Sequence, residues 1–132
     1  MSNRQIVEQI YAAMAAKDAA GVMAHLADDV TIYQDPRLPW GGNHVGHDGF
    51  VEFALALTGT ITSSVRVDEL YESDDRHVVQ YGHTIGTVNA TGAPFDVAEM
   101  HLWTIERGKV VATHFAIDTD SMLAALGAPA ST

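Results

Sequence analysis

Ala27-Asp28-Asp29-Val30-Thr31-Ile32-Tyr33-Gln34-Asp35-Pro36 is the stretch around which this chain is organised. The segment from Val30 to Gln34 alternates apolar and polar residues, which predicts a β-strand with one buried face. The strand ends at Asp35, directly before a proline that disfavours helical geometry at the preceding residue. A carboxylate held extended before the loop Leu38-Pro39-Trp40-Gly41-Gly42 is one way to build a cavity floor with a single acid or base. The plainer alternative is that Asp35 only opens a turn, a role that suits an Asp-Pro pair.

Helical patterns lie on both sides of this strand. Residues 2–16 predict a helix capped by Ser2, with Tyr11 on or beside its apolar stripe. A buried tyrosine has to place its hydroxyl on a polar partner. Asp18 is expected to cap a short helix over residues 19–26, and residues 47–58 predict a third helix whose apolar stripe contains Phe53.

The second half of the chain reads as strands separated by turns. The expected strands cover residues 61–73, 76–90, 94–106 and 109–118. A short closing helix follows from Ser121 to Leu126 and is ended by Gly127 and Pro129. Side chains at every second position of these strands should share one face, and the candidates for the inner face are Tyr81, His83, Glu99, His101, Trp103 and Phe115.

This order of elements predicts an α+β fold in one domain over residues 1–132. We expect a curved antiparallel sheet that three N-terminal helices close into a cone around an inner cavity. The later strands are apolar on both faces, so the outer face also needs a cover. A homodimer packed sheet to sheet would provide one.

The composition of the chain excludes some classes of binding partner. The net charge is −10, with only 7 Lys and Arg, so the attraction that drives binding to nucleic acid or an anionic membrane is missing. No apolar run approaches the roughly 20 residues that a bilayer-spanning helix needs. The first residues lead into an amphipathic helix rather than a secretion signal. There is no cysteine, which excludes disulfides and is compatible with a cytoplasmic protein.

Several segments resemble ketosteroid isomerase, a member of the nuclear transport factor 2-like superfamily of cone-shaped α+β proteins that also includes SnoaL-type polyketide cyclases. The resemblance is carried by Tyr11-Ala12-Ala13-Met14-Ala15-Ala16-Lys17-Asp18, by Ala24-His25-Leu26-Ala27-Asp28-Asp29-Val30-Thr31, by Gln34-Asp35-Pro36 and by Gly108-Lys109-Val110-Val111. In that enzyme a tyrosine of the first helix and the aspartate of an Asp-Pro pair have the same separation as Tyr11 and Asp35. A third element, a protonated aspartic acid, falls on His101 in this chain.

The resemblance implies proton transfer next to a carbonyl group. Asp35 would be the general base, while Tyr11 and His101 would donate hydrogen bonds to the developing enolate oxygen. Asp35 would need partial burial so that its pKa rises toward the working pH. The ligand would be a small apolar or aromatic carbonyl compound, and no cofactor is implied. Further residues expected to contact the ligand are Tyr33, Trp40, Phe53, Tyr81, His83, Glu99, Trp103 and Phe115.

Other functions stay open. Scytalone dehydratase, which works with strand histidines and tyrosines, is similar in another way, so dehydration or cyclisation by Tyr33, Tyr81, His83 and His101 is a second hypothesis. Limonene epoxide hydrolase fits less well, because its acid pair falls on Ile85 and Phe115. In polyketide cyclase relatives an acidic residue on the late strands can take part in catalysis. Asp118 is therefore a reserve catalytic candidate, in addition to its expected role as a helix cap. A protein that binds a small ligand without chemistry is the third hypothesis.

A metal site is not expected, although the chain has 7 histidines. His44 and His47 lie in a loop, and His114 has the strand parity of the outer face, so three or four converging ligands are not formed.

Overall fold

The computed structural model describes residues 1–127. Along the chain its elements are α1 (Asn3–Ala15), α2 (Ala19–Met23), β1 (Leu26–Gln34), β2 (Gly42–Val45), α3 (Gly46–Thr60), β3 (Ile61–Glu72), β4 (His77–Val88), β5 (Pro94–Glu106), β6 (Lys109–Ile117) and α4 (Thr119–Leu126). The α+β class and the order of elements are as predicted. The one element not predicted is β2, which lies in the segment expected to be a loop, and Pro129 lies outside the described residues.

Helix starts follow the predicted caps. The Ser2 hydroxyl accepts a hydrogen bond from the backbone N–H of Gln5, whose side chain accepts one in return from the Ser2 N–H. The Asp18 carboxylate caps α2, and the Asp118 carboxylate caps α4 by accepting from the N–H and hydroxyl of Ser121. Because both carboxylates satisfy free N–H groups at helix starts, their positions are explained by local structure.

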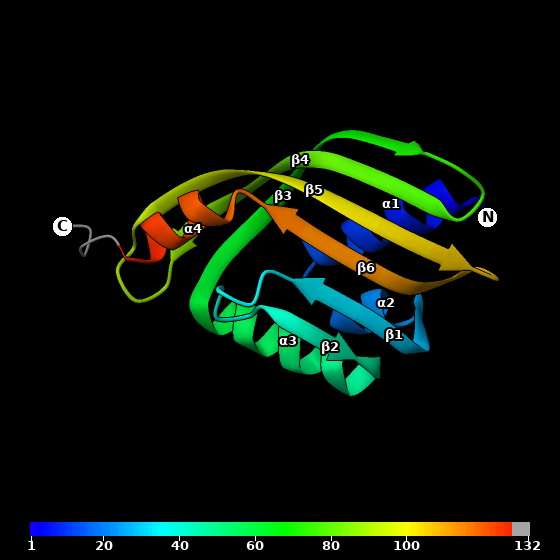
Figure 1. The fold of residues 1–132 in the computed structure, drawn as a ribbon, viewed down its shortest axis with the longest axis horizontal. Coiled ribbons are helices and arrows are strands. Elements are labelled where there is room, and N and C mark those ends of the chain that lie inside the picture. Colours follow the sequence, from blue (N-terminus) through cyan, green and yellow to red (C-terminus); the bar gives the residue numbers. More distant parts are fainter. Residues whose placement is uncertain (128–132) are drawn as a thin grey trace.

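The strands form one curved sheet of six, in the order β2-β1-β6-β5-β4-β3. All neighbouring strands are antiparallel except β1 and β6, which pair in parallel, so the sheet is mixed where a purely antiparallel one was expected. In Figure 1 the long strands β3, β4 and β5 bend over α1, while α1 and α2 lie behind the sheet and α3 lies beside β1 and β2. Helices α1, α2 and α3 therefore lie against one face of the sheet (Figure 1), while Tyr81, Met100 and Leu102 on the opposite face are exposed among the described residues.

The interior between helices and sheet is filled by side chains, where an open cavity was expected. Trp40 and Trp103 are each 1% exposed, and Phe53 and Phe115 are buried with ring centroids 5.6 Å apart. Aromatic side chains bring much apolar surface into a core, and here they occupy the space between the layers. No described helix is long and apolar enough to cross a membrane.

The faces of two strands differ from the prediction. In β4 the buried side chains include Val78, Gln80 and Val88, whereas Tyr81 is exposed, so the inner face carries the even-numbered residues. In β3 the pairing with β4 shifts between Val67 and Glu69. A bulge of this kind moves later side chains to the opposite face, and a simple alternating pattern does not reveal it.

Candidate active site

Helix α1 brings one tyrosine into the core. Ile6, Val7 and Ile10 are buried on the same side of the helix as Tyr11, which is 9% exposed. The Tyr11 hydroxyl lies 2.7 Å from Nδ1 of His101 and accepts a hydrogen bond from the Trp103 indole N–H at 3.0 Å. The expectation that Tyr11 points inward and finds a polar partner is confirmed.

Strand β5 supplies three side chains to the same place. Glu99, His101 and Trp103 alternate along the strand on its inner face, as predicted, and all three are buried. The Tyr11 and His101 rings stack with centroids 6.0 Å apart, and Trp103 lies edge-on to Tyr11 at 5.7 Å. Because side chains two residues apart lie on the same face of a β-strand, these three side chains form one polar cluster.

Gln80 of β4 completes this cluster and was missed by the sequence analysis. It lies opposite His101 in the β4–β5 pairing and is fully buried. Its side-chain N–H₂ group donates to Glu99 Oε2 at 2.6 Å and lies 3.3 Å from the Tyr11 oxygen. No local signal in the sequence identifies it, because its face depends on the register between β4 and β5, which sets Gln80 opposite His101. We call Tyr11, Gln80, Glu99, His101 and Trp103 the buried polar cluster.

Burial controls the charges in this cluster. It lowers the pKa of His101 to about 3, so the imidazole is neutral at ordinary pH. It also raises the pKa of Tyr11 above its usual range, which keeps the phenol protonated. Burial raises the pKa of Glu99 as well, although hydrogen bonds from Thr84 and Gln80 act in the opposite direction. The cluster therefore holds three titratable groups in an environment that disfavours charge.

Aromatic rings form the wall next to the cluster. The Phe115 ring lies 4.6 Å from the His101 ring and 5.5 Å from the Trp103 ring. Phe53 packs against Phe115 from α3, and the buried Trp40 donates its indole N–H to Gln34 at 2.9 Å. Of the predicted ligand-contacting residues, Phe53, Trp103 and Phe115 pack in one group beside His101, and Trp40 is buried as well.

Asp35 stands in a different setting from the one expected. Its carboxylate accepts from the backbone N–H of Arg37 and forms an ion pair with the Arg37 guanidinium at 2.9 Å, and the side chain is 32% exposed. Hydrogen bonds from Arg37 lower the pKa of Asp35, whereas a general base was expected to have a raised one. Arg37 follows two residues later and supplies the counter-charge, so the Asp35 carboxylate is paired within its own turn and does not lie in an apolar pocket.

The expectation of an inward position is wrong for Tyr33, Tyr81 and His83. Tyr33 and Tyr81 are exposed, and His83 pairs with Asp96 at 2.6 Å on the outer side of the sheet. Tyr33 instead contacts the ring of His114 edge-on at 4.8 Å. Both faces of these strands carry apolar residues, so the sequence alone did not show which face is buried.

The remaining histidines do not converge. His44 is buried against the carbonyl oxygens of Trp40 and Gly41, while His47 lies 3.0 Å from the carbonyl oxygen of Leu26. Among residues 1–127 no group of three or more His, Asp or Glu side chains is placed to hold a metal ion.

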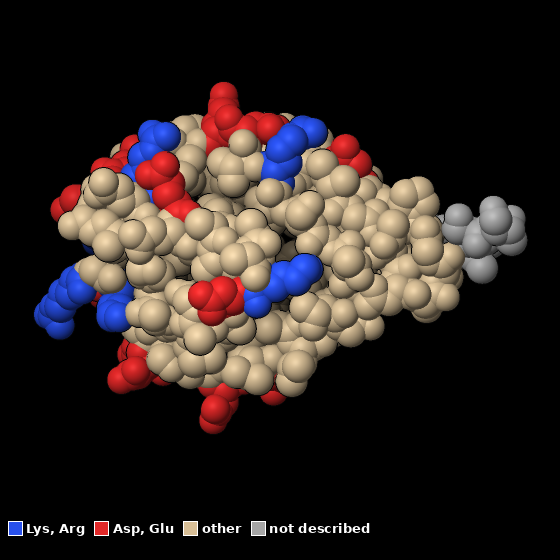
Figure 2. All heavy atoms as spheres, turned by 180° about the vertical axis from the view of Figure 1, so that it is seen from behind, with Lys and Arg blue, Asp and Glu red and all other residues tan. Residues whose placement is uncertain are grey.

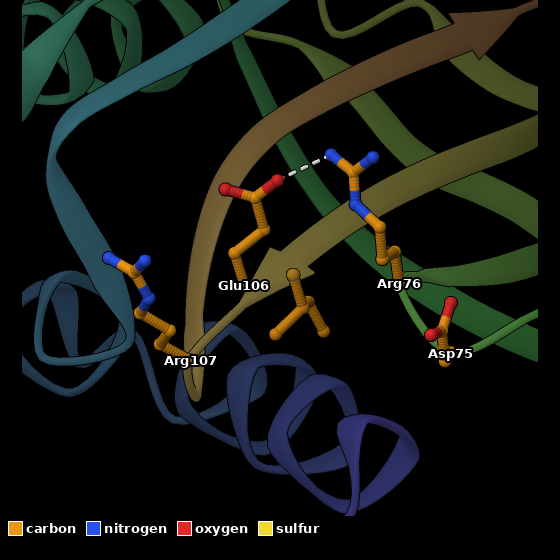
Figure 3. Close-up of a pocket in the computed structure, with 5 residues that line it drawn as sticks. Asp75, Arg76, Glu106 and Arg107 are labelled. Carbon is orange, nitrogen blue, oxygen red and sulfur yellow. Dashed lines mark hydrogen bonds and ion pairs between the residues drawn. The ribbon is translucent and has the colours of Figure 1, made fainter.

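Two open depressions lie on the surface of the described residues. One of about 340 Å³ lies between α1 and β3, lined by Arg4, Glu8, Tyr11, Val67, Asp68 and Leu70. The other, of about 480 Å³, lies beside the turns at Asp75 and Arg107, and an Arg76–Glu106 ion pair crosses it (Figure 3). Only the first depression touches the buried polar cluster, through Tyr11.

Comparison with known proteins agrees with this architecture. The SnoaL-like domain family matches residues 7–113. An NTF2-like protein of unknown function from Burkholderia pseudomallei is 29% identical, with a TM-score of 0.89 over 97% of this chain and 100% of that one. No curated protein matches the sequence.

Two more distant structures share the fold alone. TerC, co-crystallised with polyporic acid, is 21% identical with a TM-score of 0.86 over 94% of this chain and 97% of its own. A protein from Xanthomonas campestris described as a candidate polyketide cyclase is 19% identical, with a TM-score of 0.83 over 96% of this chain and 100% of its own. The family match over most of the sequence and the shared cone of helices and sheet place this chain in the SnoaL-like, NTF2-like family.

Proposed function

We propose that this protein is a small-molecule enzyme that moves protons on a cyclic or aromatic carbonyl compound, in the manner of a cyclase or dehydratase. The observation that carries the proposal is the Tyr11 hydroxyl, 2.7 Å from a neutral His101 and backed by the buried Glu99. A phenol that donates its hydrogen bond to a neutral imidazole is held in one orientation, and a group that acts in acid–base catalysis has to be positioned in this way. The ligand that TerC was crystallised with makes an aromatic carbonyl compound a reasonable first test class.

Tyr11 replaces Asp35 as the proposed proton-transfer group. The Arg37 ion pair occupies the Asp35 carboxylate and lowers its pKa, whereas a general base works best when its pKa is near the working pH. A ligand would reach the core from the helix side, where the surface is hollowed near its centre and carries few charges toward one end (Figure 2). Side chains of the aromatic wall would then have to move aside, Phe115 first among them.

The test is a comparison of Tyr11→Phe with Asp35→Asn on compounds found by a thermal-shift screen of hydroxyquinones, conjugated ketones and hydroxy-ketones. Tyr11→Phe should lower kcat by about 10²–10³-fold, within the range that one positioned acid–base group contributes. Asp35→Asn should keep most of the activity. The reverse pattern would return the role of base to Asp35 and refute this proposal.

A binding protein without catalysis is the second candidate, and the satisfied Asp35 carboxylate favours it. In that case a screened compound would raise the melting temperature but would be recovered unchanged after prolonged incubation with the protein. Tyr11→Phe would then alter affinity alone.

We also propose a homodimer through the open face of the sheet. Tyr81 lies opposite Met100 and Leu102 opposite His114 in the strand pairing, and Tyr81, Met100 and Leu102 are 37%, 50% and 40% exposed. A contiguous apolar strip on a sheet face is typical of a self-complementary interface.

Replacing Met100 with Lys should shift the protein from dimer to monomer in sedimentation velocity at micromolar concentration, because a second copy would bury the new charge. The matched control is Leu55→Lys, which adds the same charge at a residue of α3 that is 67% exposed, away from the sheet. A monomeric wild-type protein would contradict the proposal.

A further inference from the structure

The direction of the hydrogen bonds in the buried polar cluster follows from its donor-only members. The Trp103 indole N–H can only donate, so the Tyr11 oxygen accepts from it at 3.0 Å. The Gln80 side-chain nitrogen lies 3.3 Å from that oxygen and 3.2 Å from Nδ1 of His101, and as a donor it leaves both atoms as acceptors. The single proton of Tyr11 then has one acceptor left, Nδ1 of His101 at 2.7 Å.

The orientation of the Gln80 amide supports this order. Its nitrogen lies 2.6 Å from Glu99 Oε2, and the opposite orientation would place two oxygen acceptors against each other at that distance. Its oxygen has no hydrogen-bond partner among the described residues. An unpaired buried oxygen is costly, and the bond to Glu99 is what offsets that cost.

His101 therefore carries its proton on the other nitrogen. A neutral imidazole has one N–H, and with Nδ1 accepting from Tyr11 the proton lies on Nε2, 3.1 Å from Glu99 Oε2. Glu99 also accepts from Gln80 and, on its second oxygen, from the Thr84 hydroxyl. Every neighbour of the carboxyl group points a donor at it.

We infer that Glu99 and Gln80 are positioning residues that hold His101 as the Nε2–H tautomer, so that Nδ1 of His101 accepts the hydrogen bond of the Tyr11 hydroxyl and is not itself a hydrogen-bond donor to the ligand. This reverses the role that family resemblance implies for His101. During turnover the Tyr11 O–H bond would stay directed at Nδ1 and would fix the orientation of the phenol next to the ligand. That role in turnover rests on the proposed function, whereas the tautomer is a property of the free protein.

The test is NMR spectroscopy of protein labelled with ¹⁵N-histidine, which distinguishes protonated from unprotonated ring nitrogens. At neutral pH the His101 ring should show an unprotonated Nδ1 and a protonated Nε2. Glu99→Gln should populate the second tautomer, because an amide can donate to Nε2 as well as accept from it. Thr113→Val is the matched control, since Thr113 is buried beside Trp103 in the strand pairing and its hydroxyl has no hydrogen-bond partner within residues 1–127. The His101 signals of this variant should match those of the wild type.

A protonated Nδ1 in the wild type would overturn the inference, and so would a Glu99→Gln protein that keeps the pure Nε2–H form. Should Glu99→Gln fail to fold, Gln80→Met provides the second variant. This variant is expected to lose the single His101 tautomer, and a Gln80→Met protein that keeps the pure Nε2–H form would contradict the inference. None of these measurements uses a substrate. A confirmed tautomer together with full activity of Tyr11→Phe would refute the proposed function and leave this inference standing.

Discussion

Replacement of Trp103 with Ala should lower the free energy of unfolding by about 3–5 kcal/mol, the usual cost of truncating a buried aromatic side chain. Trp103 is 1% exposed and contacts the rings of Tyr11, His101 and Phe115. The change removes apolar contacts and also the indole N–H that the Tyr11 oxygen accepts from. Urea denaturation followed by circular dichroism measures the loss.

Trp103→Phe separates these two contributions. This variant keeps an aromatic ring in the core but deletes the indole N–H. It should lower the free energy of unfolding by about 1–3 kcal/mol, the cost of removing one partner of a buried hydrogen bond, which is less than the loss in the alanine variant. Equal losses for both variants would mean that packing around Trp103 contributes little. That result would contradict the description of this region as a filled aromatic core.

Replacement of Phe115 with Ala should likewise cost about 3–5 kcal/mol, and it should also open a binding cavity. The Phe115 ring lies between those of Phe53, His101 and Trp103, so its removal leaves a space bounded by aromatic side chains. Cavities of this kind bind small aromatic molecules. Phenol or indole should raise the melting temperature of Phe115→Ala and leave that of the wild type unchanged.

The matched control is Phe115→Leu, which retains most of the volume and should lose less stability and show little ligand-dependent shift. A rise in melting temperature of equal size in the wild type would show that the core already admits aromatic ligands. A Phe115→Ala protein that binds nothing would indicate that the surrounding side chains collapse into the space.

Local rules explain how much of the fold could be predicted. Ser2, Asp18 and Asp118 satisfy free N–H groups within three residues, so these helix starts depend only on nearby sequence. The inner face of β5 was also predictable, because Phe95, Val97, Trp103 and Ile105 bracket the two polar residues Glu99 and His101 on one side.

The positions that escaped prediction depend on distant partners. The parity of β4 is set by its register with β5, and the bulge in β3 moves side chains between faces without a clear sequence signal. Gln80 belongs to the site only because that register sets it opposite His101. Asp35 is the exception, because its partner Arg37 is only two residues away and the turn after Asp35 brings the two side chains together.

The sequence by itself determined the α+β class, the helix starts, and the presence of Tyr11, Glu99, His101 and Trp103 on inward-facing positions, since caps and strand alternation act over a few residues. The tertiary structure alone decided that Gln80 joins them and that aromatic rings fill the interior. Hydrogen-bond direction and pKa depend on which groups meet after the chain has folded, and no local pattern carries that information.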